Sequence, residues 1–218
     1  MKVLIAMDSL KGCLSSPAAG AALKGGILRA MPEADIQVCP LADGGEGTTE
    51  ALTFGSGGHL QAVTVKGPLV MEMSAAAGIT LVPEAERDPL KTTTFGVGEM
   101  ILDALGKGCR TFLIGIGGSA TNDGGAGMLQ ALGFDLVDEE GRRIPQGAAG
   151  LAVLRWIGTE RVPKALADCR FRIACDVGNP LCGPKGASAV YGPHKGAGPA
   201  DVEKMDRWLA EYARIAFQ

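Results

Sequence analysis

The chain has 218 residues, 46% of them hydrophobic and 21% charged, which is enough to bury a sizeable core as one large domain or two small ones. Its formal net charge of −3 argues against a general nucleic-acid surface, because such a surface needs a basic face. The apolar run at residues 2–7 is too short for a signal peptide or a membrane span, so a cytoplasmic protein without a membrane partner is expected.

The first predicted unit is a buried strand at residues 2–7, followed by an alanine-rich helix that ends near Arg29. Ser16 is the expected N-cap of this helix, because Pro17 suits the first helical position. Three polar side chains follow the strand, where open α/β sheets bind ligands: Asp8, Ser9 and Lys11. A ligand-binding Lys11 and a solvated loop lysine fit this pattern equally well.

A second strand at residues 35–39 leads into a glycine loop with two carboxylates, Asp43 and Glu46. A helix at residues 49–52 begins after the loop. The carboxylates either cap this helix or, beside a bound phosphate, hold Mg²⁺. The alternating pattern at residues 60–65 predicts a further strand.

A second unit begins near residue 70. Its first clear helix is at residues 98–105, with apolar side chains on one face, and residues 92–94 before it are all threonine. One of these threonines is expected to cap the helix, and Thr93 is assigned to a ligand through its hydroxyl.

Residues 115–127 contain six glycines and directly follow a predicted buried strand at residues 111–114. A helix at residues 128–132 comes next, so free N–H groups and the positive end of the helix dipole suit a phosphate or carboxylate. The polar side chains of this loop are those of Ser119, Asn122 and Asp123. The alternative interpretation is a glycine-rich turn in which Asp123 caps the helix.

The remaining predicted elements are strands at residues 134–137 and 171–175 and an amphipathic helix at residues 201–217, with Asp201 as its N-cap. Asp176 follows the second of these strands and is either an ordinary turn residue or part of a site. Four strand ends thus carry acidic or hydroxyl side chains beside glycines. Their convergence would indicate an enzyme that handles a phosphorylated ligand.

The six cysteines are scattered and form no Cys-x-x-Cys pair. With only two histidines in the chain, this distribution does not predict a zinc site. Buried free thiols in a reducing compartment are expected instead.

Five stretches together resemble the bacterial glycerate kinase family, at residues 7–12, 41–48, 88–96, 114–125 and 175–183. They include Leu-Ala-Asp-Gly-Gly-Glu-Gly-Thr in the second stretch and Gly-Gly-Ser-Ala-Thr-Asn-Asp-Gly-Gly in the fourth. The resemblance implies two α/β domains, the first Rossmann-like, with a cleft between them. It also implies ATP-dependent, Mg²⁺-dependent phosphorylation of D-glycerate, usually at the 2-hydroxyl, giving 2-phosphoglycerate or else 3-phosphoglycerate.

Phosphoryl transfer needs a cation, a metal-binding carboxylate, anion-binding amides and an acid that orients the attacking hydroxyl. Lys11 is the expected cation, Asp43 and Glu46 are the expected Mg²⁺ ligands, and Asp176 or Asp123 is the expected base. The residues assigned to phosphate or glycerate are Ser9, Thr93, Gly117, Gly118, Ser119, Asn122 and Asn179.

The chain differs from the family pattern in two places. It lacks a C-terminal continuation with a Gly-Glu-Gly-Arg-x-Asp motif and a short β segment near residue 70. The resemblance therefore implies that residues 1–67 are part of a domain that the missing segment completes, and that residues 68–218 are the second domain.

Two other function classes are alternatives to a kinase. A non-catalytic anion-binding fragment is the alternative if the closing half is absent. A nicotinamide-dependent oxidoreductase is disfavoured, because no glycine loop has the dinucleotide spacing. The expected ligand is D-glycerate, and no nucleic-acid partner is expected. The sequence leaves open whether the protein forms a homodimer.

Overall fold

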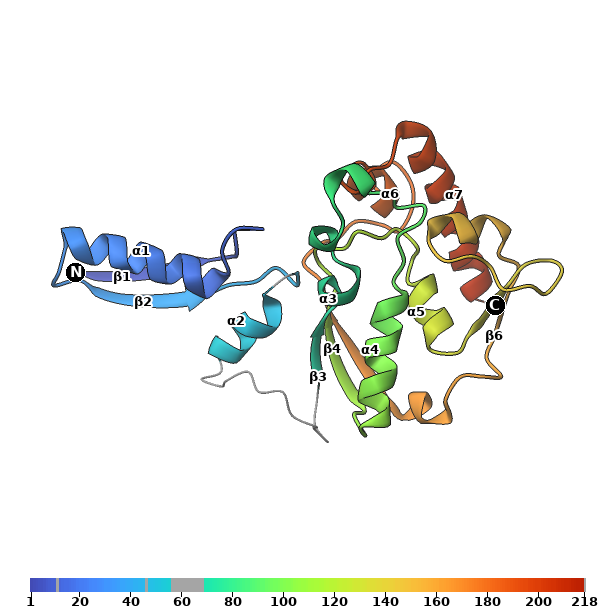
Figure 1. The fold of residues 1–218 in the computed structure, drawn as a ribbon, viewed down its shortest axis with the longest axis horizontal. Helices are drawn as coiled ribbons and strands as arrows, with labels where there is room; N and C mark the ends of the chain where they lie inside the picture. Colours follow the sequence, from blue (N-terminus) through green and yellow to red (C-terminus); the bar gives the residue numbers. More distant parts are fainter. Residues whose placement is uncertain (11, 46, 56–68, 218) are drawn as a thin grey trace.

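The computed structural model describes residues 1–10, 12–45, 47–55 and 69–217. Parallel strands alternate with helices along the chain (Figure 1), which confirms the predicted α/β class. Among the helices of the described part, none is both long enough and apolar enough to cross a membrane. The strand expected at residues 60–65 lies outside the described residues.

The N-terminal unit consists of strand β1 (Lys2–Met7), helix α1 (Ser16–Ala30) and strand β2 (Asp35–Pro40). The two strands pair in parallel, and α1 packs against both of them. Helix and strand approach closely at Gly20, since a Cβ there would lie 2.4 Å from the Val38 Cγ1 atom. In Figure 1 this βαβ unit projects away from the later elements, to which it is joined through helix α2 (Thr48–Gly55).

Ser15, and not Ser16, is the N-cap of α1, so the predicted cap was wrong by one residue. The Ser16 hydroxyl instead donates to the Met7 carbonyl at 2.6 Å and accepts from the Leu41 N–H at 3.2 Å. It therefore joins the ends of β1 and β2 as an additional partner of two backbone groups that also bond to each other, since the Leu41 N–H donates to the Met7 carbonyl at 2.9 Å.

The second unit is built on a parallel sheet with the order β3-β4-β7, made of Leu69–Glu72, Thr111–Gly115 and Arg170–Ala174. Helix α4 (Phe95–Gly106) covers one side of it. The buried side chains of Ile101 and Phe112 are at the centre of the core between helix and sheet. The three strands are parallel, so their carboxyl ends meet at one edge of the sheet.

A second core lies where helix α5 (Ala126–Ala131) meets helix α7 (Pro199–Ala216) and the antiparallel pair β5 (Asp135–Val137) and β6 (Trp156–Gly158). Gly198 is the N-cap of α7 and Pro199 its first residue, so the prediction of Asp201 as N-cap was wrong. The remaining short helices are α3 (Ser74–Ala77), α6 (Ala187–Tyr191), η1 (Ile79–Leu81), η2 (Glu84–Glu86), η3 (Ala148–Val153), η4 (Lys164–Asp168) and η5 (Pro193–Lys195).

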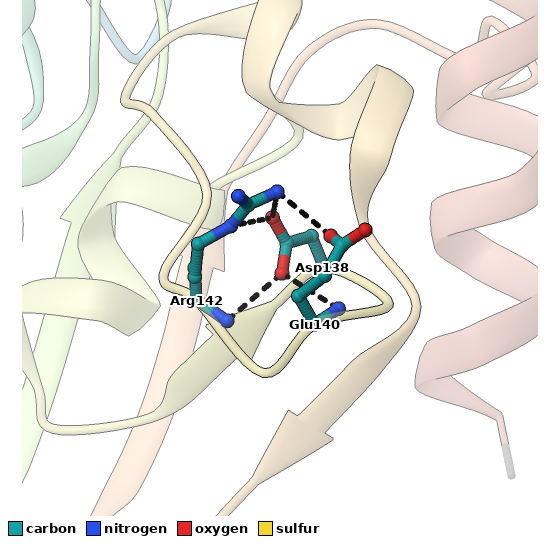
Figure 2. A network of polar contacts seen from close by, with 3 residues as sticks. All are labelled: Asp138, Glu140 and Arg142. Atoms are coloured by element: carbon teal, nitrogen blue, oxygen red, sulfur yellow. Dashed lines mark hydrogen bonds and ion pairs between the residues drawn. The ribbon is translucent and has the colours of Figure 1, made fainter.

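A tight turn after β5 is held by one carboxylate (Figure 2). Asp138 accepts hydrogen bonds from the backbone N–H groups of Glu140 and Arg142 and from the Arg142 guanidinium at 2.9 Å. Burial raises the pKa of Asp138, but the hydrogen bonds and charge of Arg142 outweigh it and lower that pKa overall. The carboxylate of Asp138 therefore stabilises the turn.

All six cysteines are free thiols, but only Cys109 is buried, and Cys13 and Cys175 are exposed. The expectation of buried thiols thus holds for one residue of the six. Cys109 begins the run into β4, where an apolar side chain packs into the core, whereas Cys13 and Cys175 belong to loops.

Candidate functional site

A cavity of about 1110 Å³ lies against the carboxyl ends of β4 and β7. Its polar lining comes from three strand-end loops that are far apart in sequence, from Thr94 before α4, from Tyr191 of α6 and from the short helix η5. The sequence-predicted residues that line it are Asp43, Gly117, Gly118, Ser119, Asn122, Asp123 and Asp176. The predicted convergence of strand ends therefore holds for the loops after β2, β4 and β7.

The glycines of two of these loops are packed against each other. The Gly117 N–H donates to the Gly44 carbonyl at 2.9 Å, and a Cβ on Gly115 would lie 2.5 Å from the same oxygen. A Cβ on Gly117 would lie 2.6 Å from the Gly45 nitrogen. Glycine is thus required at these positions for contact between loops, and the Gly117 amide, predicted to bind an anion, is already occupied.

Substituting Gly117 by alanine is expected to lower the free energy of unfolding by about 1–3 kcal/mol, because the methyl group would force the loops after β2 and β4 apart. Urea denaturation of the two proteins measures the difference. Gly178→Ala is the matched control, since no atom lies within 4 Å of a Cβ at that position. Equal losses in both variants would contradict the packing argument.

Asp123 is 1% exposed and accepts four hydrogen bonds. Its Oδ2 atom accepts from the Thr94 N–H and hydroxyl, both at 2.9 Å, and from the Gly127 N–H at 3.2 Å. Its Oδ1 atom accepts from the Gly125 N–H at 3.2 Å. The Thr94 hydroxyl in turn accepts from the Met128 N–H. Asp123 therefore joins the N-termini of α4 and α5 through its side chain, although the N-cap residues of these helices are Thr94 and Gly125 and not Asp123.

Lys195 reaches the cavity from η5 and was not identified from the sequence. Its Nζ atom donates to the Ser119 hydroxyl at 2.9 Å and to the Thr121 carbonyl. Burial lowers the pKa of Lys195 to about 8, although the charge of Asp123 raises it. The available signal was its place in Gly-Pro-His-Lys-Gly at residues 192–196, a polar pair between glycines like those of the other site loops.

The lowered pKa of Lys195 predicts that stability rises with pH between about 8 and 10.5. Below that range the lysine is charged in both states. Within it the folded protein has lost a proton that the unfolded chain keeps, which favours folding. Relative to Lys195→Met, the wild type should gain about 2–3 kcal/mol between pH 7 and 10.5.

Burial also raises the pKa values of the Cys169 and Cys182 thiols, so their contribution to protein stability falls over the same pH range. Because both proteins contain these thiols, the difference between the wild type and Lys195→Met isolates the contribution of the lysine. Denaturant titrations at several pH values give the difference between the two proteins. A difference that does not change with pH would show that Lys195 keeps its ordinary pKa in the folded state.

Three of the residues assigned to ligand binding are engaged in protein contacts. The Asn122 amide donates to the Ser188 hydroxyl at 2.9 Å and so links α6 to the loop after β4. The Thr93 hydroxyl accepts from the Phe95 N–H at 3.2 Å, at the start of α4. Asn179 is bonded to the Lys185 carbonyl and the Tyr191 hydroxyl. Thr93 and Asn179 do not line the cavity.

The loop after β2 is held by a carboxylate that the sequence did not single out. Glu72, at the end of β3, accepts from the Gly47 N–H at 3.0 Å and the Thr49 N–H at 2.7 Å. It therefore caps α2, a role considered for Asp43 and Glu46. The Asp43 Oδ1 atom accepts from the Gly45 N–H, and its residue lines the cavity. Glu46 and Lys11 lie outside the described residues.

Asp176 follows β7 and is exposed at the cavity. Ser9, at the end of β1, does not line it. The described residues contain no group of three or more His, Cys, Asp or Glu side chains that could hold a metal ion without further ligands. A cation bound here would thus take ligands from a substrate or water as well.

Residues 3–218 match the profile of the glycerate kinase family. The chain belongs to that family. It is 44% identical to the glycerate 2-kinase of Escherichia coli K12, over 99% of this chain and 61% of that protein. It is 43% identical to the glycerate kinase of Haemophilus influenzae, over 99% and 62% of the two chains.

A crystal structure from Salmonella typhimurium LT2 that bears the name glycerate kinase 2 has a TM-score of 0.77 with this chain and is 46% identical in sequence. The match covers 99% of this chain and 63% of that one. The described part of the chain thus resembles that structure in its α/β fold. It spans 61–62% of the length of the curated family members named above.

Proposed function

We propose that this chain carries the phosphoryl-transfer site of an ATP-dependent D-glycerate kinase. The observation that supports this most is the cavity at the carboxyl edge of the β3-β4-β7 sheet, where loops with glycine, hydroxyl and carboxylate groups meet in a member of the glycerate kinase family. Open α/β sheets bind their ligands at this edge. The relative named glycerate 2-kinase supports the 2-hydroxyl as the acceptor.

Asp176 is the proposed base. It lines the cavity and is exposed, so its carboxylate is available to accept a proton from a substrate hydroxyl. Asp123 is not retained for this role, because four donors from the protein already occupy its oxygens. As the family resemblance implies, Lys11 is the proposed cation, Ser9 a proposed contact of phosphate or glycerate, and Glu46 a proposed Mg²⁺ ligand.

The residues that line the cavity fit Mg²⁺ bound together with ATP. Magnesium is commonly held by one or two carboxylates together with phosphate oxygens and water, and Asp43 and Asp176 line the same cavity. When bound, Mg²⁺ neutralises phosphate charge that develops during transfer. Asp43 would hold it at the loop after β2, which the contacts of Gly44 and Gly117 fix beside the glycine loop.

The site lies where the two proposed domains, residues 1–67 and 68–218, meet. The loop after β2 belongs to the first and contacts the glycine loop of the second through Gly44 and Gly117. The six free cysteines fit the reducing cytoplasm as the compartment of this enzyme.

Release of ADP, measured by a coupled assay with ATP, Mg²⁺ and D-glycerate on protein of verified intact mass, tests the proposal. Turnover that depends on D-glycerate is expected, and phosphorus NMR of the product identifies the hydroxyl. A folded protein that forms no ADP above the rate without D-glycerate would contradict it. Such a result would favour an anion-binding part of a kinase, because the chain spans only 61–62% of its curated relatives.

A further inference from the structure

Lys195 is half-buried, and its ammonium group has only neutral hydrogen-bond partners. It donates to the Ser119 hydroxyl and the Thr121 carbonyl, and none of the ion pairs among the described residues includes it. An ammonium group has three protons, so one remains after these two bonds. A charge that is partly removed from water and has no opposite charge in contact is disfavoured, which makes an external counter-ion favourable.

The charge of Asp123 acts on Lys195, but the two residues form no ion pair. Both Asp123 oxygens accept hydrogen bonds from Thr94, Gly125 and Gly127. Its charge only partly offsets the effect of burial on the lysine. The ammonium is therefore the group in this part of the cavity whose electrostatic requirement the described residues do not meet.

Other groups that suit an anion lie beside Lys195. Ser119, bonded to the ammonium, lines the cavity together with Gly118. Within the described residues, the N–H groups of Gly118 and Ser119 donate to no protein acceptor, whereas the Gly117 N–H is bonded to Gly44. Backbone N–H groups next to a cation form a familiar kind of oxyanion site.

We propose that Lys195 is the cation of an oxyanion subsite in this cavity, which it forms with the Ser119 hydroxyl and the amides of Gly118 and Ser119. The ligand is a small carboxylate or a phosphate group, whose oxygen takes the third ammonium proton. The proposal rests on the proposed function only for its choice of ligands, D-glycerate and ATP. Asp176 and Asp43 lie at the same cavity, so the subsite would hold the anion beside the proposed base and metal ligand.

Calorimetric titration of D-glycerate and of ATP, each alone, into the wild type and three variants tests the subsite. Lys195→Met should weaken one of the two ligands at least tenfold, and Lys195→Arg should recover part of the loss. If only the affinity for D-glycerate falls, the subsite binds a carboxylate. If only the affinity for ATP falls, it binds a phosphate. The control, Lys204→Met, removes an exposed lysine of α7 that pairs with Asp201, and it should bind like the wild type.

The pH dependence of D-glycerate binding separates an ionic role from a structural one. Wild-type affinity should fall as pH rises from 7 to 10, because Lys195 loses its proton, while the ligand carboxylate stays ionised. The other titratable groups that line the cavity are Asp43, Asp123, Cys175, Asp176, Tyr191 and His194. Their contributions remain in Lys195→Met, in which the profile should be flat by comparison.

Wild-type affinity for both ligands in Lys195→Met, or no binding of either ligand by the wild type, would overturn the proposal. The binding measurements do not depend on turnover. Lysine-dependent binding without ADP formation would therefore leave the subsite in place and count against the kinase. ADP formation by the wild type, together with unchanged affinities in Lys195→Met, would support the kinase and count against the subsite.

Discussion

Asp123→Ala is expected to lower the free energy of unfolding by about 3 kcal/mol or more, because it leaves the buried donors of Thr94 and Gly127 and the half-buried N–H of Gly125 without an acceptor. For a chain of this size, that loss corresponds to a fall of roughly 10 °C in melting temperature. Calorimetry or circular dichroism on the purified variant measures it. The effect is large because one carboxylate holds the first turns of both α4 and α5.

Two further variants make the Asp123 result specific. Asp123→Asn keeps the size of the side chain but turns an NH₂ group toward donors, so it should also be destabilised. Asp103→Ala removes an exposed aspartate that pairs with Lys107 on α4, and it should change stability by only about 0.5 kcal/mol. An Asp123→Ala protein that melts with the wild type but has lost turnover would show that the carboxylate acts on substrate and not on the fold.

Much of the fold follows from local patterns in the sequence. Apolar runs such as residues 111–114 form strands, in which Phe112 and Ile114 are buried on one face and Leu113 is half-buried on the other, and the glycines after them mark the turns. The same reasoning placed Asp43, Ser119 and Asp176 at one edge, where the cavity lies. Parallel topology brings strand ends together whatever the details of the loops.

The use of each polar group did not follow from local patterns. A glycine loop is compatible with an anion site or with close packing, and the structure uses Gly117 for packing against Gly44. Asp123 could be a base or a structural acceptor, and two of the four hydrogen bonds that distinguish these roles come from Thr94, 29 residues away. Lys195 lies 76 residues from Ser119 in sequence, so no spacing rule joins the two residues.

Helix boundaries were predicted less well, for a related reason. The helix expected from residue 98 begins at Phe95, because the Asp123 carboxylate accepts the Thr94 N–H next to its start. The cap of α2 likewise comes from Glu72 in another strand. Each of these helix ends is satisfied by a residue from a distant element, which the sequence around the helix does not reveal.

Asp176→Asn should lower kcat for D-glycerate phosphorylation at least about 100-fold with little change in melting temperature. The reason is the contrast with Asp123. Asp176 is exposed at the cavity after the last residue of β7, so its loss leaves no buried group unpaired, whereas the proposed reaction needs a carboxylate there. Initial rates of ADP release and thermal melts on the same preparations measure the two effects.

The two aspartates should therefore separate function from folding. Asp176→Asn is expected to be stable and slow, and Asp123→Asn to be destabilised. Asp103→Asn, on the surface of α4, should resemble the wild type in both measurements. Turnover by Asp176→Asn at the wild-type rate would remove it from the role of base and return that role to residues outside the described part of the chain or to the substrate phosphate itself. A reduced rate that is restored by a higher D-glycerate concentration would instead make Asp176 a binding residue, since a base acts on kcat and not on KM alone.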